Sequence, residues 1–141
     1  MKFLTTFFFI CLLTAFFQTD LQAQLIADVD AIQSAPLHAG VSRTYQHDFK
    51  TVIKSARETI VESGLVLESA SKVDDNVYML VAKAKTSAFS WGELVRVVVE
   101  KEKANESTIR VYTKRRVKIN VTAKADYSNT IISNMDLKLD L

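Results

Sequence analysis

Residues 48–64, DFKTVIKSARETIVESG, constrain the fold more than any other stretch of the chain. Apolar side chains recur there at the spacing that places them on one face of an α-helix; they are Phe49, Val52, Ile53, Ala56 and Ile60. Asp48 can accept hydrogen bonds from the free N–H groups of the first turn, and Gly64 can take the left-handed conformation that commonly ends a helix. The stretch therefore predicts one amphipathic helix that buries a single face.

After Gly64 the hydrophobic period changes from helical to strand-like for most of the remaining chain. We expect strands over residues 41–45, 65–69, 77–84, 94–101 and 108–122. The strand at 77–84 is apolar on both faces, which is typical of a central strand. The strand at 108–122 alternates apolar odd-numbered residues with polar even-numbered ones. That alternation indicates an antiparallel sheet with one face in water.

Residue parity predicts the register of the last two strands. Their core-facing residues are expected to be the odd-numbered ones in both, for example Val95 and Val97 in one strand and Ile109 and Val111 in the other. Residues that face each other across this antiparallel pair must then sum to an even number. We therefore expect a loop with an odd number of residues, three, in which Asn105 adopts the left-handed conformation.

The tail at 125–141 carries an apolar stripe at helical spacing, formed by Tyr127, Ile131, Ile132, Met135 and Leu139. Alternation of Leu137, Leu139 and Leu141 is the competing pattern, that of a terminal strand, and we favour the helix. Together these patterns predict an α+β fold with a single domain at residues 41–141. We expect a two-layer sandwich with one or two helices packed on one face of an antiparallel sheet of four to five strands.

Residues 1–23 have the pattern of a signal peptide. Lys2 precedes an almost wholly apolar run at 3–17, and the small residue Ala23 ends a plausible cleavage site. The apolar run is shorter than the roughly 20 residues that span a membrane. Cleavage near Ala23 predicts a periplasmic or secreted protein, and an uncleaved membrane anchor is the alternative.

Two further expectations concern the N-terminal part of the chain. The only cysteine, Cys11, lies inside it, so the mature chain is expected to hold no disulfide and no thiolate metal site. Residues 24–40 are interpreted as an N-terminal tether or a fraying turn of helix, interrupted at Pro36 and Gly40.

The motifs of common catalytic sites are missing from the sequence. Its three glycines are scattered and cannot build a Gly-rich phosphate loop, and no G-x-S-x-G motif is present. His38 and His47 are the only histidines, which is few for a zinc site. We therefore expect no catalytic residue, no metal and no cofactor, and interpret the protein as a non-enzyme. A Ser-His-Asp arrangement assembled by folding remains the alternative.

A basic stripe is expected on the polar face of the last strand, formed by Arg110, Lys114, Arg116 and Lys118. It can contact an anionic component of the cell envelope or an acidic partner protein. The alternative is a solvated outer face that is neutralised by Glu100 and Glu102 of the neighbouring strand. Nucleic acid is not expected as a partner, because only Tyr112 is interleaved as a stacking platform.

Two aromatic residues, Phe89 and Trp91, lie in the connection at 85–93, which should be polar. Aromatic side chains exposed in a loop can anchor a partner protein or a membrane interface. Alternatively, both rings fold back and cover one end of the core. Membrane association through such residues would be peripheral.

Residues 40–67, GVSRTYQHDFKTVIKSARETIVESGLVL, run as strand, helix, glycine and strand. This stretch resembles the start of small bacterial envelope domains, such as those repeated in the BamC outer-membrane assembly lipoprotein and in periplasmic lipoproteins of similar size. In those domains an aromatic residue ends the first strand, as Tyr45 would here. The lipid-anchor cysteine of such lipoproteins is missing at the cleavage site. The resemblance implies a binding module and carries over no catalytic residue.

These observations favour a non-enzymatic binding or scaffolding module of the bacterial cell envelope. Its expected partner is an envelope protein or an anionic envelope component, and its oligomeric state is not indicated. One alternative is a carrier that holds a small apolar ligand between helix and sheet. The other is a hydrolase with an unrecognised site.

Overall fold

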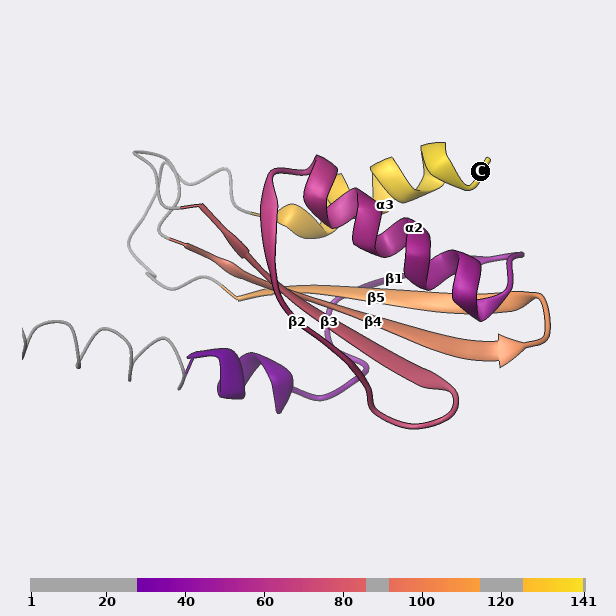
Figure 1. The fold of residues 1–141 in the computed structure, drawn as a ribbon, viewed down its shortest axis with the longest axis horizontal. Coiled ribbons are helices and arrows are strands. Elements are labelled where there is room, and N and C mark those ends of the chain that lie inside the picture. The colour runs from indigo at the N-terminus through magenta and orange to yellow at the C-terminus, as the bar shows by residue number, and fades with distance from the viewer. Residues whose placement is uncertain (1–27, 86–91, 115–125, 141) are drawn as a thin grey trace, which may run out of the picture.

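The computed structural model describes residues 28–85, 92–114 and 126–140, which form one antiparallel sheet with helices on it (Figure 1). In chain order the labelled elements are β1 (Val41–Tyr45), α2 (Phe49–Glu62), β2 (Leu65–Lys72), β3 (Val77–Ala84), β4 (Leu94–Lys103), β5 (Glu106–Lys114) and α3 (Tyr127–Lys138). The five strands lie in the order β1-β5-β4-β3-β2. Helices α2 and α3 pack on the same face, so the predicted α+β sandwich is confirmed.

Helix α2 forms where the apolar period predicted it. Asp48 is the N-cap, and its Oδ1 accepts hydrogen bonds from the backbone N–H groups of Lys50 at 3.0 Å and Thr51 at 3.1 Å. The residues of its buried face include Val52, Ala56 and Ile60. Gly64 follows with φ +76°, a left-handed conformation that turns the chain into β2.

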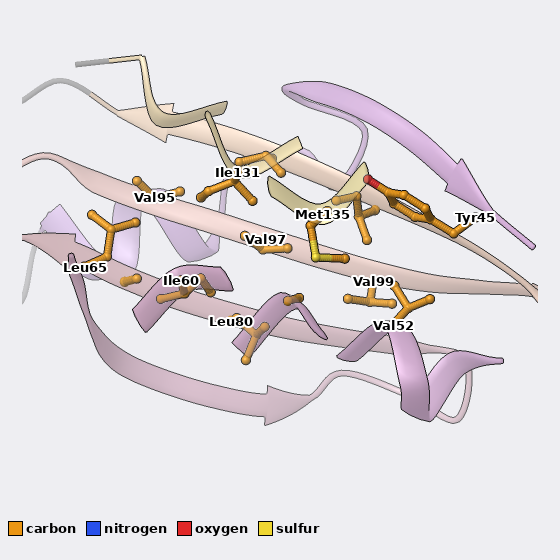
Figure 2. Packing of buried hydrophobic residues seen from close by; sticks show 14 of the residues in the cluster. Tyr45, Val52, Ile60, Leu65, Leu80, Val95, Val97, Val99, Ile131 and Met135 are labelled. Carbon is orange, nitrogen blue, oxygen red and sulfur yellow. The ribbon is translucent and has the colours of Figure 1, made fainter. Parts of the chain in front are cut away.

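The main core lies between the two helices and the sheet (Figure 2). The sheet side is lined by the predicted odd-numbered residues of β4 and β5, including Val97, Val99 and Ile109, which are fully buried. Ile131 and Met135 of α3 cover it beside α2. The helix favoured for the tail is therefore confirmed over the terminal strand.

The β4–β5 hairpin agrees with the predicted parity but not with the predicted loop. Val97 faces Val111 and Val99 faces Ile109, pairs whose numbers sum to an even value. Lys103, however, pairs with Glu106 across a two-residue loop. The three-residue loop was wrong because a register shift between Lys101 and Lys103 absorbs the extra residue. Left-handed Asn105 was also wrong, since Asp140 is the only described non-glycine residue with positive φ.

Residues 28–40, which we call the strap, cross the face of the sheet opposite to α2 and α3 (Figure 1). Residues 28–33 are helical, and Ile32 is fully buried against β3 and β4. Of the two interpretations of this segment, tether and helical turn, the structure shows a helical turn that belongs to the packing of the domain. The face expected to lie in water is thus partly covered, because β3 and β4 are apolar on this side too.

Gly40 joins the strap to β1. Its φ is +108°, and a Cβ built on it would lie 2.2 Å from the carbonyl oxygen of Val111 in β5. Both the backbone conformation and the close approach require glycine. The strap can therefore enter the sheet beside β5 only because this residue has no side chain.

Strand boundaries differ from the predicted ones at two places. β2 continues to Lys72 through a register shift between Leu67 and Ser69, and β5 begins at Glu106. The predicted continuation of β5 over 115–122 lies outside the described residues, as does the predicted signal peptide. Among the helices that the structure describes, none is long and apolar enough to cross a membrane.

Candidate functional site

The described half of the predicted basic stripe is paired with carboxylates. Arg110 donates a hydrogen bond from Nε to Glu100 Oε2 at 2.9 Å, and both side chains are about three-quarters buried, 26 % and 23 % exposed. Lys114 donates from Nζ to Asp28 Oδ1 of the strap at 3.3 Å. Cross-strand neutralisation by Glu100, the alternative to a free basic surface, is therefore what the structure shows at Arg110.

The other predicted contact residues cannot be placed. Arg116 and Lys118 lie outside the described residues, and so do Phe89 and Trp91 of the β3–β4 connection. Their role as partner-binding residues stays a prediction. The described residues that flank them, Lys85 and Lys114, lie at the same end of the sheet as the start of the strap, because Lys114 contacts Asp28.

The polar residue that sequence reasoning missed is Arg96, near the start of β4. Its side chain is fully buried. Its guanidinium group donates hydrogen bonds to three strap carbonyls, those of Ile32 at 3.1 Å, of Ala35 at 2.5 Å and of Pro36 at 2.7 Å. The carbonyl of Ile32 lies in the last helical turn of the strap, where backbone acceptors have no partner within the helix, and those of Ala35 and Pro36 follow it. Arg96 therefore caps the end of this helix.

The surroundings of Arg96 are otherwise apolar or aromatic. The guanidinium carbon lies 5.6 Å from the ring centroid of Tyr112 on β5, within the range of a cation–π contact. No hydrogen-bond partner of Nε is present in the described part of the chain. Burial lowers the pKa of Arg96, and the electrostatic interaction with the neighbouring Tyr112 offsets part of this shift by raising the pKa. An arginine side chain stays protonated in proteins, so a positive charge is held beneath the strap.

One sequence signal could have revealed this residue. Arg96 is the only charged residue between Leu94 and Val99, and it shares the parity of Leu94 and Val98. Alternation assigned that parity to a wet face, which made an exposed arginine the natural interpretation. The strap covers the face of the sheet that carries Arg96. It could not be placed there from the sequence, because its own apolar residues are too few to predict where it packs.

On the helix face, a second polar group fastens β1 to α3. Tyr45 donates its hydroxyl hydrogen to Asp136 Oδ1 at 3.0 Å, and Arg43 donates to both carboxylate oxygens of Asp136 at 3.2 and 3.0 Å. Burial raises the pKa of Tyr45, and the hydrogen bond to Asp136 raises it further. The arrangement holds a neutral tyrosine hydroxyl against a carboxylate and joins two elements of the fold.

The two histidines lie apart. The ring of His47 is hydrogen-bonded through Nε2 to the carbonyl oxygen of Leu139 at 3.2 Å, while His38 is exposed in the strap. Ser107 approaches His47 only at the backbone, donating from Oγ to its carbonyl oxygen at 3.2 Å. Within residues 28–85, 92–114 and 126–140, no group of three or more potential metal ligands is found.

A surface depression of about 240 Å³ lies where β2 begins and β3 ends, lined by Val66, Glu68, Lys83, Ala84 and Lys85. Val66 faces Lys83 across the two strands. The depression is therefore at the rim of the sheet and not between the sheet and α2, where the ligand of an apolar carrier was expected. The side chains in that interior layer, such as Val52, Ile60 and Leu80, are fully buried.

No protein-family model, no curated protein and no solved structure matches this chain.

Proposed function

We propose that this protein is a non-enzymatic binding or scaffolding module of the bacterial cell envelope, exported by its leader and cleaved near Ala23. The proposal rests on the signal-peptide pattern of residues 1–23 and on the way the described polar side chains are used. Its expected partner is an envelope protein or an anionic envelope component.

The observation that carries the proposal is the placement of the groups that a hydrolase would need. The His47 ring contacts a backbone carbonyl at the end of α3, and the hydroxyl group of Ser107 is directed to the backbone of His47. The carboxylate of Asp136 is engaged by Arg43 and Tyr45. Each of these described groups joins secondary-structure elements, and this structural use supports a non-enzymatic role.

A capture experiment from envelope extracts tests the proposal. The mature chain, tagged at its C-terminus, is immobilised and the bound protein, lipid and glycan are quantified by mass spectrometry. The matched control carries Gly40→Ala, which should disturb the fold through the contact with Val111. We expect enrichment by the native chain alone. Equal recovery by both chains, or none above background, would contradict a binding function.

The leader is tested separately on protein isolated from its host. Mass spectrometry of the intact protein should give Gln24 as the mature N-terminal residue, without a lipid. A retained leader would instead indicate a membrane-anchored protein.

A further inference from the structure

The strap covers an apolar strip on the sheet, formed by Met79, Val81, Leu94 and Val98, all of which are buried. Ile32 inserts into this strip and Val29 packs beside it. Ile32 is the only fully buried side chain among residues 28–40. One apolar anchor therefore accounts for most of the hydrophobic attachment of the strap.

The strap also complements the charge of this face. It brings Asp28 to Lys114 at 3.3 Å, and it brings three carbonyl oxygens to the guanidinium group of Arg96. Carbonyl oxygens carry partial negative charge, so both contacts join negative groups of the strap to cations of the sheet. An apolar strip with two cations beside it remains if the strap leaves.

We propose that this strip, together with Arg96 and Lys114, is a docking site for a short acidic amphipathic helix of a partner protein, and that the strap is its internal, competing occupant. The proposal rests on the proposed function as a binding module and names the kind of partner. The chemistry of the occupant is set by the strap itself, whose helical residues 28–33, DVDAIQ, combine two acidic residues with Val29 and Ile32, three positions apart and so on one face of the helix.

The geometry of Arg96 favours a peptide over a lipid surface. The guanidinium group lies within the sheet face and is fully buried, and its acceptors are backbone carbonyls of one short segment, those of Ile32, Ala35 and Pro36. A short peptide segment can present such carbonyls to a buried guanidinium group. The headgroups of a flat lipid surface would instead contact cations that are exposed at the rim of the sheet.

Opening of the strap is partly compensated at the same arginine. In the closed state Arg96 is withdrawn from water, and no partner of its Nε is found in the described part of the chain. Opening returns the guanidinium group to water, which offsets part of the cost of exposing the strip. The hydration regained by the guanidinium group therefore offsets part of the hydrogen bonding and apolar burial that are lost when the strap opens.

Peptide binding to the full mature chain tests this inference. The probe is a fluorescein-labelled synthetic peptide of residues 28–40, titrated by fluorescence anisotropy against the native chain and an Ile32→Ala chain. The variant loosens its own strap but keeps the strip and both cations. We expect its apparent Kd to be at least about tenfold lower than that of the native chain, because about 1.4 kcal/mol of lost strap stability makes the open state tenfold more populated.

Two controls define the site. A peptide with Asp28→Lys and Asp30→Lys should bind at least about tenfold more weakly, and an Ile32→Ala, Arg96→Met chain should lose the gain in affinity. Circular dichroism verifies that each chain is folded, and Ile32→Val is the milder replacement if Ile32→Ala unfolds. Absence of saturable binding to a folded Ile32 variant, or equal binding of the basic peptide, would overturn the proposal.

A binding experiment with lipid vesicles tests the other source of negative charge, an anionic membrane surface. Vesicles of phosphatidylglycerol that bind the Ile32→Ala chain while the peptide does not would assign the face to a membrane and overturn the peptide site. Capture of an envelope partner equally by the native and variant chains would leave the binding function standing and place it on another surface. Failure of the two proposals is therefore distinguishable.

Discussion

The two faces of the sheet are covered in different ways. On one face, α2 and α3 bury a continuous apolar layer, in which Ile60 and Met135 are fully buried. On the other, the strap inserts one fully buried side chain, Ile32, and engages a buried cation, Arg96. The first face is held mainly by apolar area and the second largely by polar contacts to the backbone. Burial alone therefore does not tell which layer is permanent and which can be released.

The largest expected effect compares one substitution on both faces. Ile60→Ala and Ile32→Ala each remove the same atoms from a fully buried site. We expect Ile60→Ala to lower the free energy of unfolding by about 3–5 kcal/mol, the upper part of the range for such cavities. Ile32→Ala should lower it by about 2 kcal/mol or less, because the strap can open while the sheet stays folded. Urea unfolding followed by circular dichroism measures both.

Val61→Ala is the control for that comparison, since Val61 is 64 % exposed and should change stability by no more than about 0.5 kcal/mol. Equal losses for the two isoleucine variants would show that both faces unfold together. The contrast between a permanent and a releasable layer would then be wrong.

A second test concerns the junction of the strap with the sheet. Gly40→Ala should destabilise the protein by about 2–4 kcal/mol, because the new Cβ meets the Val111 carbonyl oxygen and φ is +108°. Gly64→Ala is the matched variant, with φ +76° but no atom within 4 Å of the added Cβ, and should cost about 1 kcal/mol. Thermal unfolding of both chains measures the difference. Similar losses would mean that backbone conformation alone, and not the close approach to β5, requires glycine at the junction.

A third prediction isolates the polar attachment of the strap. Arg96→Met removes the donor to the carbonyls of Ile32, Ala35 and Pro36, and we expect the strap to lose about 1–3 kcal/mol of protection. Hydrogen exchange of backbone amides at 29–40, read by mass spectrometry, is the measurement. Faster exchange should be confined to the strap and leave α2 unchanged.

Arg57→Met is the control for that experiment. Arg57 also lies 5.6 Å from a tyrosine ring, that of Tyr78, but on the exposed surface of α2. Its replacement should leave strap exchange unchanged. Slower exchange in the Arg96→Met chain would show that the buried cation weakens the strap on balance, as some buried charges do.

The smallest effect lies on the helix face and appears only at alkaline pH. Burial and Asp136 raise the pKa of Tyr45 above the value of about 10 that it has in the unfolded chain. The neutral hydroxyl therefore stabilises the fold fully below pH 10, and this contribution is lost as pH rises above it. Tyr45→Phe should flatten the fall in stability above pH 10.

Absorbance at 295 nm checks the same group directly. The difference between the titrations of the native and Tyr45→Phe chains gives the Tyr45 pKa, which Asp136→Asn should lower only in part, since burial remains the larger cause. A native Tyr45 that titrates near pH 10 would contradict a dry contact between β1 and α3.

Much of the helix face could be predicted from sequence because its signals are long and local. The period of α2, its cap at Asp48 and the two-sided apolarity of β3 each depend on neighbouring residues only. The β4–β5 loop was missed because parity determines only whether the numbers of two paired residues sum to an even value. It does not determine where a bulge takes up an extra residue.

The strap face was predicted less well because its contacts join distant parts of the chain. Glu100, which neutralises Arg110, lies on the adjacent strand and was foreseen as the alternative to a free basic stripe. The partner of Lys114 was not foreseen, since Asp28 lies 86 positions away in the sequence. Arg96 was hidden for a related reason, because its acceptors are backbone atoms, which leave no trace in side-chain patterns.

The use of backbone oxygens by Arg96 also affects how this protein can change during evolution. Carbonyl groups are common to all residues, so exchange of side chains at Ala35, or at the exposed neighbour Ser34, leaves the acceptors in place. Mutational drift along the strap is thus tolerated wherever the path of the chain is kept. Selective constraint should concentrate instead on Ile32 and Gly40 of the strap and on the distant arginine itself, positions that no local motif would connect.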